Sequence, residues 1–220
     1  MVDQVMERRF DVPVRYLNLY AGIGGNRAQL PDDVEVVAVE LDERVAAVYA
    51  ELYPDDEVVV GDAHQYLLEH GADDFDWVWS SPPCQSHSRM MKATRHKLRR
   101  YPDMALYQEI LFCQHFVKVP WVVENVAPYY EPLVAPTQRV GRHLFWSSAP
   151  FEVDDIKRPA GFINQATLAG KEVLMDWLGI HFEQNVYLDG NHCPAQILRN
   201  AVHPRIGRSI FDQVSALDSA

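Results

Sequence analysis

The residue best suited to covalent chemistry is Cys84, which follows two prolines at the end of an apolar run. Its surroundings read SSPPCQSHS over residues 80–88. Prolines fix φ and remove backbone donors, so this segment should leave the run extended and stiff. The thiolate is the reactive form of cysteine, and the basic run at 89–100 would favour it. The setting predicts a nucleophile for an electron-poor carbon, with an inert buried cysteine as the alternative.

A metal site is the other alternative for this cysteine. Cys84 and His87 form a C-x-x-H pair, and the chain also contains the neighbouring pairs Cys113/His115 and His192/Cys193. These spacings do not match a standard zinc motif, so we expect no metal.

Three apolar runs end in residues that suit an adenosine compound. The run at 15–21 leads into Gly-Ile-Gly-Gly at 22–25, a turn that lets a backbone approach a ligand closely. The next two runs end at Glu40, which could accept both hydroxyls of a ribose, and at Asp62, which could accept from an adenine amino group. Each signal is weak alone. In series they predict an adenosine pocket along one sheet edge.

A fifth apolar run ends in Glu124 and Asn125. A glutamate beside a bound base could hydrogen-bond or protonate a ring nitrogen, provided that burial raises its pKa. A solvated acid at the end of a strand is the alternative.

The elements that position these residues alternate between strands and helices. This alternation, with continuous apolar strands, predicts an α/β fold around a mostly parallel sheet. The expected strands are 15–21, 34–41, 57–63, 76–81 and 120–126, with short strands at 142–148 and 151–153; the expected helices are 42–53, 103–117 and the tail from 200.

Composition limits the class of protein. The chain has 220 residues, 48% hydrophobic, with a net charge of −11 and three cysteines. This predicts one domain without a disulfide framework, a membrane span or a signal peptide, in the cytoplasm. The acidic balance argues weakly against a protein that coats nucleic acid. The basic run at 89–100 is the exception, and its position after Cys84 favours contacts with phosphates over a solvated face.

Taken in order, these segments resemble the DNA cytosine-5 methyltransferases. NLYAGIGG is similar to the family's cofactor motif, VELD to its ribose acid, GDA to its adenine-side acid and PPCQSHS to its catalytic Pro-Cys-Gln-x-x-Ser. ENV matches its Glu-Asn-Val, and RNAVHPRIGRSI is similar to its closing motif. The resemblance covers about residues 15–147 and 199–217, and the segments are specific in this order.

The resemblance implies a Rossmann-like S-adenosylmethionine-dependent methyltransferase fold and methylation of cytosine C5 in duplex DNA, with S-adenosylhomocysteine as product. Cys84 would add to C6 of a flipped base and Glu124 would polarise N3. The implied catalytic residues are Cys84, Glu124, Asn125 and Arg142. The implied cofactor contacts are Asn18, Tyr20, Ala21, Gly22, Gly24, Gly25, Glu40, Leu41, Asp62, Ala63, Pro82, Asn200 and Ala201. The expected DNA contacts are Gln85, Ser88, Arg89, Lys92, Arg95 and Lys97.

The chain departs from the family pattern at several positions. Asn18 stands where the family usually has Asp, and Tyr20 replaces a commoner Phe. Arg199 and Ala201 replace Gly and Ser in the closing motif, and Val140 replaces an arginine of the family's Gln-x-Arg-x-Arg motif. This last change leaves Arg142 as the remaining arginine of that pair.

Size is the largest departure. We expect a catalytic domain of residues 12–147 plus 199–220, and a reduced target-recognition region at 148–198. So small a region has few side chains to read base edges, which predicts a short or relaxed target sequence, or recognition supplied by a protein partner or oligomer. The compact form is similar to phage versions, so a bacterial or phage-infected host, a nucleoid location and a role in restriction–modification are the matching expectations.

Two other classes of function stay open. One is a related base-modifying transferase that acts on a free nucleotide or moves a larger group. The other is a catalytically impaired DNA-binding or decoy protein, with which Asn18 and the incomplete arginine motif are compatible; the intact Cys84 and Glu124 argue against it.

Overall fold

A seven-stranded sheet forms the centre of the protein, in a computed structural model that describes residues 13–88, 101–162, 167–188 and 193–217. The strand order is β3-β2-β1-β4-β5-β7-β6. The strands are β1 (Val14–Leu19), β2 (Val34–Glu40), β3 (Glu57–Val60), β4 (Trp77–Ser80), β5 (Trp121–Val126), β6 (Gln138–Val140) and β7 (His143–Ser147). Strands β1 to β5 are parallel, and β7 is antiparallel to both β5 and β6. The predicted α/β fold with a mostly parallel sheet is confirmed.

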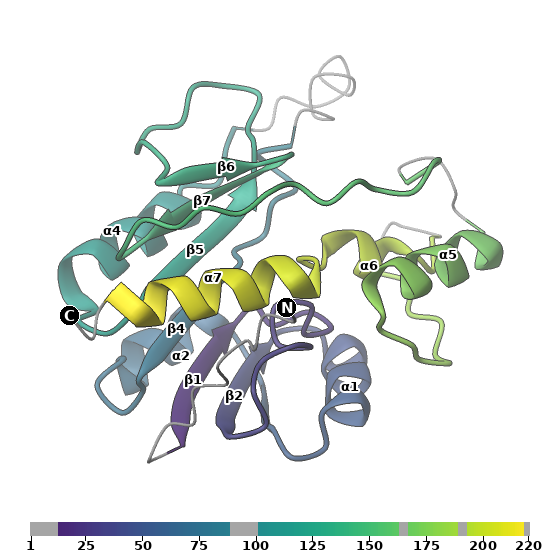
Figure 1. Ribbon diagram of the computed structural model, residues 1–220, viewed down its shortest axis with the longest axis horizontal. Helices are drawn as coiled ribbons and strands as arrows, with labels where there is room; N and C mark the ends of the chain where they lie inside the picture. Colours follow the sequence, from purple (N-terminus) through teal and green to yellow (C-terminus); the bar gives the residue numbers. More distant parts are fainter. Residues whose placement is uncertain (1–12, 89–100, 163–166, 189–192, 218–220) are drawn as a thin grey trace, which may run out of the picture.

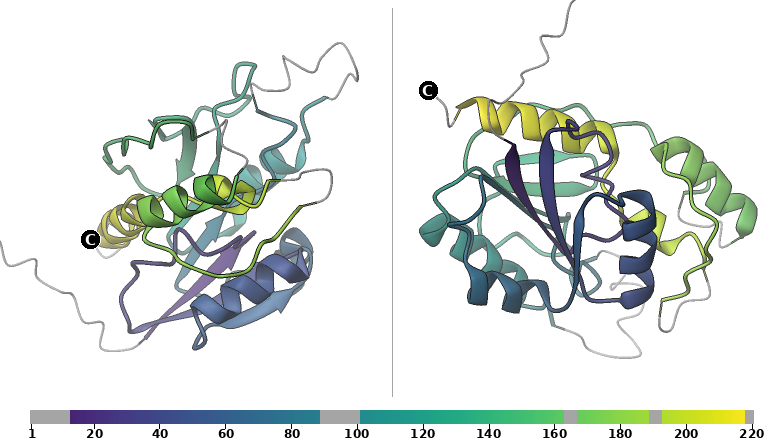
Figure 2. Two further views of the ribbon diagram at one scale, coloured as in Figure 1. Left: turned by 90° about the vertical axis from the view of Figure 1, so that its right-hand side faces the viewer. Right: turned by 90° about the horizontal axis from the view of Figure 1, so that it is seen from below.

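The helices cover both faces of the sheet (Figures 1 and 2). They are α1 (Glu43–Leu52), α2 (Ala63–His70), α4 (Ala105–Phe116), α5 (Leu168–Leu178), α6 (Gln196–Asn200) and α7 (Pro204–Leu217). Helix α7 and part of α1 pack on one face, where Tyr16, Trp77 and Trp79 form an aromatic core with Phe211. Helices α2 and α4 pack on the opposite face, against side chains such as Leu17. Burial on both faces explains why the strand sequences are continuously apolar.

The sequence placed the first five strands and the helices α1, α4 and α7 within a few residues. It missed α2, β6, α5 and α6, and residues 151–153, which were expected to form a strand, belong to none of the strands in the described chain. The strand expected at 57–63 ends at Val60, because Asp62 caps α2 by accepting from the Gln65 amide at 2.9 Å.

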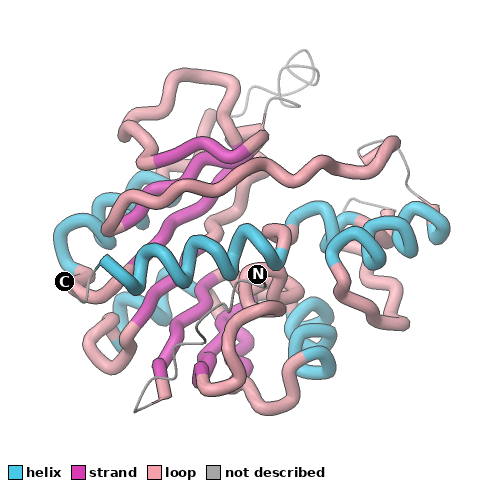
Figure 3. Tube along the Cα trace, viewed as in Figure 1, coloured by secondary structure: helices cyan, strands magenta, loops and turns pink. Residues whose placement is uncertain are grey.

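The described residues of 167–188 and 193–200 form an apolar cluster beside the sheet, and Figure 3 shows a long loop leading towards their short helices. Residues 148–156 instead pack on the sheet core, through Phe151, Val153 and Ile156. Helices α5 and α6 pack with the outer side of α1 in their own apolar core. Lys171 of α5 is buried, and its ammonium donates to the carbonyls of Phe182, Glu183 and Gln184 at 3.1, 3.2 and 2.7 Å. These bonds fix α5 to the strand-like segment that follows it. None of the helices in the described part of the chain is long and apolar enough to cross a membrane.

The closing segment before and within α7 lies directly on the glycine turn. A Cβ atom added to Gly25 would lie 2.2 Å from the carbonyl oxygen of Val202, and one added to Gly207 would lie 2.7 Å from the backbone of Asn26. Such distances are far below van der Waals contact, so both positions require glycine. This contact packs the start of α7 and the segment before it on the glycine turn after β1, at the predicted cofactor edge.

Substituting Gly207 by alanine should therefore destabilise the protein, because Cβ would force α7 away from Asn26. Overpacking of this kind costs about 1–3 kcal/mol, which outweighs the helix preference of alanine. Urea unfolding of Gly207→Ala measures the loss. Gly61→Ala is the matched control, because no atom lies within 4 Å of its added Cβ and its stability should change little. Equal stabilities for the two variants would contradict this packing of α7.

Candidate active site

The carboxyl ends of β4 and β5 bring the two predicted catalytic segments together. Ser80 of β4 is in register with Val123 of β5, so Ser81 and Glu124 follow side by side. Ser81 donates its backbone N–H to the carbonyl of Leu19 at 3.2 Å and its hydroxyl hydrogen-bonds the Glu124 carboxyl. The parallel ladder therefore fixes the position of Glu124 beside the start of the proline segment.

Asn125 joins β5 to the prolines. Its side-chain amide donates to the carbonyl of Pro82 at 2.9 Å, and its oxygen accepts the backbone N–H of Val126 at 3.0 Å. The side chain is 1% exposed. Asn125 therefore supports the segment that carries Cys84.

Cys84 begins a tight turn. Its carbonyl accepts the N–H groups of both His87 and Ser88 at 3.1 Å. The turn is then joined to the chain after β5, because Ser88 forms a bridge with Pro128 and the Tyr129 N–H donates to the His87 carbonyl at 3.2 Å. The thiol stands on a turn that is held from two sides.

A chain of hydrogen bonds ends at the ring of His87, a residue that the sequence analysis treated only as a possible metal ligand. These bonds bear on which ring nitrogen carries the proton. The Leu133 N–H donates to the Tyr107 hydroxyl at 3.2 Å, Tyr107 donates to Tyr130 at 3.1 Å, and the Tyr130 hydroxyl lies 2.6 Å from His87 Nδ1. The direction that uses both hydroxyl protons makes Nδ1 an acceptor and leaves the proton on Nε2.

That Nε2 atom is buried and has no hydrogen-bond partner. Asp103 lies near the ring and acts on it through its charge and its backbone, while the Asp103 N–H donates to the Ser86 hydroxyl at 3.0 Å. Burial lowers the pKa of His87, with Asp103 opposing. His87 is therefore neutral at pH 7 and anchors the cysteine turn through Tyr130.

Burial also controls the two predicted catalytic groups. It raises the pKa of the Cys84 thiol to about 11, with the charge of Glu124 adding to the rise and Arg142 opposing it. Burial raises the pKa of Glu124 to about 7, while Ser81 and Arg142 lower it. The thiolate that the sequence expected is thus not the resting form, because the buried turn and a nearby carboxylate both favour the thiol.

His143, at the start of β7, lies beside the same carboxyl. Its Nδ1 is 3.9 Å from Glu124 Oε1. Burial lowers the pKa of His143 to about 3, with Arg142 and Arg158 contributing. The ring is therefore neutral, and the contact is not an ion pair at pH 7. Arg142 instead donates its Nε proton to His143 Nε2 at 3.0 Å.

The predicted ribose acid occupies the centre of the cofactor edge. Glu40 accepts the backbone N–H of Gly22 on one carboxylate oxygen and that of Asp42 on the other, both at 2.9 Å. Each oxygen keeps lone pairs for a further donor. Gly22 has φ +56° and no atom within 4 Å of an added Cβ, which leaves space at the turn.

The surroundings of Glu40 fit an adenosine compound. Leu41 is 69% exposed and could cover a base, and Asp62 is exposed at the next strand end. A separate open groove of about 610 Å³ lies between β2, β3 and α2; Gly61 and Asp62 line one end of it, but Glu40 and Leu41 do not. Tyr20, with φ +56°, lies near enough to Asp62 for that charge to help burial raise its pKa.

Three further predicted cofactor residues lie around the glycine turn. Ala201 lies against Gly25, and Asn200 is exposed beside it. Asn18 is 1% exposed and pairs with Asn26, whose amide donates to the Asn18 oxygen at 2.8 Å. Asn18 thus lies behind the glycine turn.

Most of the expected DNA contacts cannot be placed. Gln85 is exposed, whereas Arg89, Lys92, Arg95 and Lys97 lie outside the described residues.

The sequence did not reveal a buried acid beneath this edge. Glu109 of α4 is fully buried, accepts the Ser80 hydroxyl at 2.8 Å and lies 2.5 Å from His64 Nδ1. Burial raises its pKa. Its helical spacing alone gives no sign of this role, because Glu109 sits among apolar core residues. No metal-binding group of three or more ligands occurs among the described residues.

Comparison with known proteins identifies a family that the chain resembles. The model of the C-5 cytosine-specific DNA methylases matches residues 14–116, which include the glycine turn, both predicted cofactor acids and Cys84. Over these residues the chain is similar to the C-5 cytosine-specific DNA methylases. The comparison supports a methyltransferase that uses S-adenosylmethionine, with cytosine C5 as the family's target.

Two solved methyltransferase structures share the fold of this chain. The Dnmt2 methyltransferase of S. pombe aligns with a TM-score of 0.57 at 13% identity, over 93% of this chain and 98% of that one. The methyltransferase EhMeth of Entamoeba histolytica aligns with a TM-score of 0.55 at 9% identity, over 94% and 99%. At such identities the likeness concerns the fold alone. No curated protein sequence matches the chain.

The coupling of the two predicted catalytic groups predicts the reactivity of the Cys84 thiol. Glu124→Gln removes a charge that raises the Cys84 pKa, so alkylation by iodoacetamide should accelerate above pH 7 by about tenfold for each unit that the pKa falls. Below about pH 6 wild-type Glu124 is itself protonated, so the two rates should converge. Cys113 and Cys193 are buried, which makes labelling selective.

Glu109→Gln is the matched control, because it neutralises a buried carboxyl that is not among the charges acting on Cys84. Its alkylation rate should follow the wild type. Equal rates for Glu124→Gln and wild type at pH 8 would show that Glu124 does not control the thiol.

Proposed function

We propose that the protein transfers a methyl group from S-adenosylmethionine to C5 of cytosine in DNA through a covalent bond between Cys84 and C6. The observation that carries the proposal is the pair of buried side chains, Cys84 and Glu124, at adjacent strand ends. Cys84 is a thiol that needs to lose a proton, and Glu124 is a carboxyl that holds one near neutral pH.

A single proton on Glu124 serves two purposes in this proposal. The protonated carboxyl can donate to N3 of a cytosine, and it also removes the negative charge that opposes the Cys84 thiolate. In the reactive state, therefore, Glu124 is protonated and Cys84 is a thiolate. The charge of Arg142 lowers the pKa of both groups, so it favours the Cys84 thiolate and opposes the protonated form of Glu124.

The covalent step balances with these groups alone. The thiolate forms a bond to C6, the electrons of the C5–C6 double bond move toward C5 and N3, and the Glu124 proton goes to N3. When bound, S-adenosylmethionine would supply the methyl from its sulfonium and leave as S-adenosylhomocysteine. Once C5 carries the methyl, the C5 proton would go to solvent, its electrons would restore the C5–C6 double bond and expel the Cys84 thiolate, and N3 would return its proton to Glu124.

The cofactor contacts follow from the edge of the sheet. Glu40 would accept the ribose hydroxyls on its remaining lone pairs, Leu41 would cover the adenine and Asp62 would accept its amino group. The glycine turn would approach the methionine part, since Gly22 has open space. The cytosine must leave its helix to reach Cys84, as for other enzymes that modify bases.

Two alternatives need separate tests. A free-nucleotide transferase would need a cavity that encloses a nucleotide beside Cys84, whereas the Cys84 turn here continues into Gln85, which is exposed. A decoy without activity would not need a buried thiol beside a buried carboxyl, both with raised pKa values. Both observations favour the enzyme on nucleic acid.

Trapping on fluorinated DNA tests the proposal. Fluorine at C5 blocks the loss of the C5 proton, so the protein with S-adenosylmethionine and a 5-fluorocytosine duplex should form an adduct that survives denaturation. Cys84→Ser should form none, and Glu124→Gln should form it at least about 100-fold more slowly, within the range for loss of a general acid. Gel mobility and peptide mass spectrometry measure both.

Matched substrates separate the alternatives. Cys113→Ser is the control, because that thiol is buried in the α4 core and should not affect trapping. Trapping by 5-fluorocytidine RNA or by the free nucleotide, but not by duplex DNA, would reassign the substrate. A wild-type protein that binds DNA and forms no adduct would support the decoy.

A further inference from the structure

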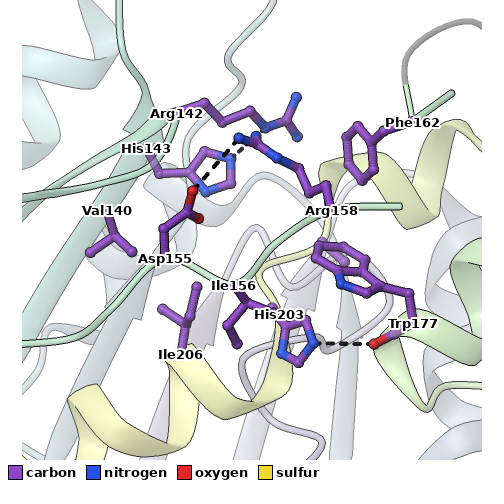
Figure 4. Close-up of a pocket in the computed structure, with 11 residues that line it drawn as sticks. Val140, Arg142, His143, Asp155, Ile156, Arg158, Phe162, Trp177, His203 and Ile206 are labelled. Carbon is purple, nitrogen blue, oxygen red and sulfur yellow. Dashed lines mark hydrogen bonds and ion pairs between the residues drawn. The ribbon is translucent and has the colours of Figure 1, made fainter. Parts of the chain in front are cut away.

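A small cavity lies where the β6–β7 hairpin, the segment after β7 and the start of α7 meet (Figure 4). Its volume of about 20 Å³ admits roughly one water-sized group, so it does not enclose a base. Its lining carries five ionisable side chains: Arg142, His143, Asp155, Arg158 and His203. The cavity therefore marks a polar junction between the catalytic sheet and the predicted recognition region.

Arg142 has no anionic partner in this junction. Its Nη2 donates to the Arg199 carbonyl at 2.5 Å, its Nε donates to His143, and its Cζ lies 5.0 Å from the centre of the Phe162 ring. Within the described part of the chain, no carboxylate oxygen approaches its guanidinium to 4.0 Å. Burial lowers its pKa, with Glu124 opposing from a distance. A guanidinium so placed is poised to bind an anion.

Arg158 adds a second guanidinium to the same place. Its Cζ lies 5.8 Å from the centre of the Phe162 ring, the ring that Arg142 also contacts. Its carboxylate partner is Asp155 at 3.8 Å, and the two side chains are 31% and 47% exposed. An ion pair this long and exposed contributes little free energy, so a stronger acceptor can replace Asp155.

The charges around the junction leave it locally positive. His143 and His203 both have lowered pKa values and are neutral at pH 7. Two guanidinium groups thus face one carboxylate, in a chain whose net charge is −11. Arg142 also acts electrostatically on Glu124 and Cys84, so this positive spot adjoins the catalytic pair.

We propose that Arg158, together with Arg142, binds a backbone phosphate oxygen of the nucleic acid beside the target cytosine, and that Asp155 is the counter-ion which this phosphate displaces. The inference rests on the proposed function and assigns Arg158 a role that lies outside the family motifs. Planar guanidinium groups suit phosphate oxygens, and Phe162 keeps both side chains oriented toward the junction.

Binding of a short cytosine-rich duplex over a range of salt concentrations tests the proposal. Arg158→Gln should weaken binding about tenfold at 100 mM salt and reduce the slope of log affinity against log salt by about 0.9. Lys157→Gln is the matched control, since this exposed neighbour does not line the cavity. It should change affinity by no more than about twofold.

Asp155→Asn provides a second measurement that does not depend on the loss of an arginine. Freeing Arg158 from its carboxylate should tighten binding about threefold, and this gain should vanish in the Asp155→Asn, Arg158→Gln double variant. Arg158→Lys, which keeps the charge, should recover part of the affinity. Affinity for S-adenosylhomocysteine should be unchanged throughout, because the cofactor carboxylate would be the other source of an anion.

The outcomes are distinct. If Arg158→Gln binds DNA like Lys157→Gln, or if Asp155→Asn acts equally without Arg158, the phosphate site is wrong while the proposed function stands. If Arg158→Gln loses affinity for S-adenosylhomocysteine and not for DNA, the anion is that of the cofactor. If the unaltered protein neither binds nor traps DNA, both proposals fail.

Discussion

The electrostatic coupling between Cys84 and Glu124 is the interaction on which the proposed chemistry depends. Both groups are buried at the carboxyl edge of the sheet, where each favours its protonated form. The negative charge of Glu124 is one cause of the high pKa of the thiol. Neutralising that carboxyl therefore activates the nucleophile, and the carboxyl proton is the one that a cytosine ring nitrogen would need.

The fold maintains this coupling through backbone contacts more than through flexible side chains. The β4–β5 ladder sets Glu124 beside Ser81, and Asn125 fastens the proline segment through the Pro82 carbonyl. His87 anchors the Cys84 turn through the hydrogen bond between its ring and the Tyr130 hydroxyl. Each contact limits the movement of a group whose pKa depends on burial, so the scaffold controls the electrostatics by excluding water.

The sequence predicted the sheet and the site edge because both follow from local rules. Apolar runs ending in Glu40, Asp62, Cys84 and Glu124 place these residues at one edge whenever the strands are parallel. The resting state of the thiol could not be predicted, because it depends on burial and on Glu124, distant by 40 positions in sequence. Contacts between separate segments, such as those of Arg142 and Arg158 with the same Phe162 ring, leave no periodic pattern either.

The protonation state of Glu124 is the most direct test of the account. The side-chain carboxyl carbon of Glu124, assigned by comparison with Glu124→Gln, can be followed by ¹³C NMR as the pH is changed. The account predicts a midpoint near pH 7, because burial opposes the carboxylate. A midpoint close to the value of about 4.3 that is usual for exposed glutamates would contradict it.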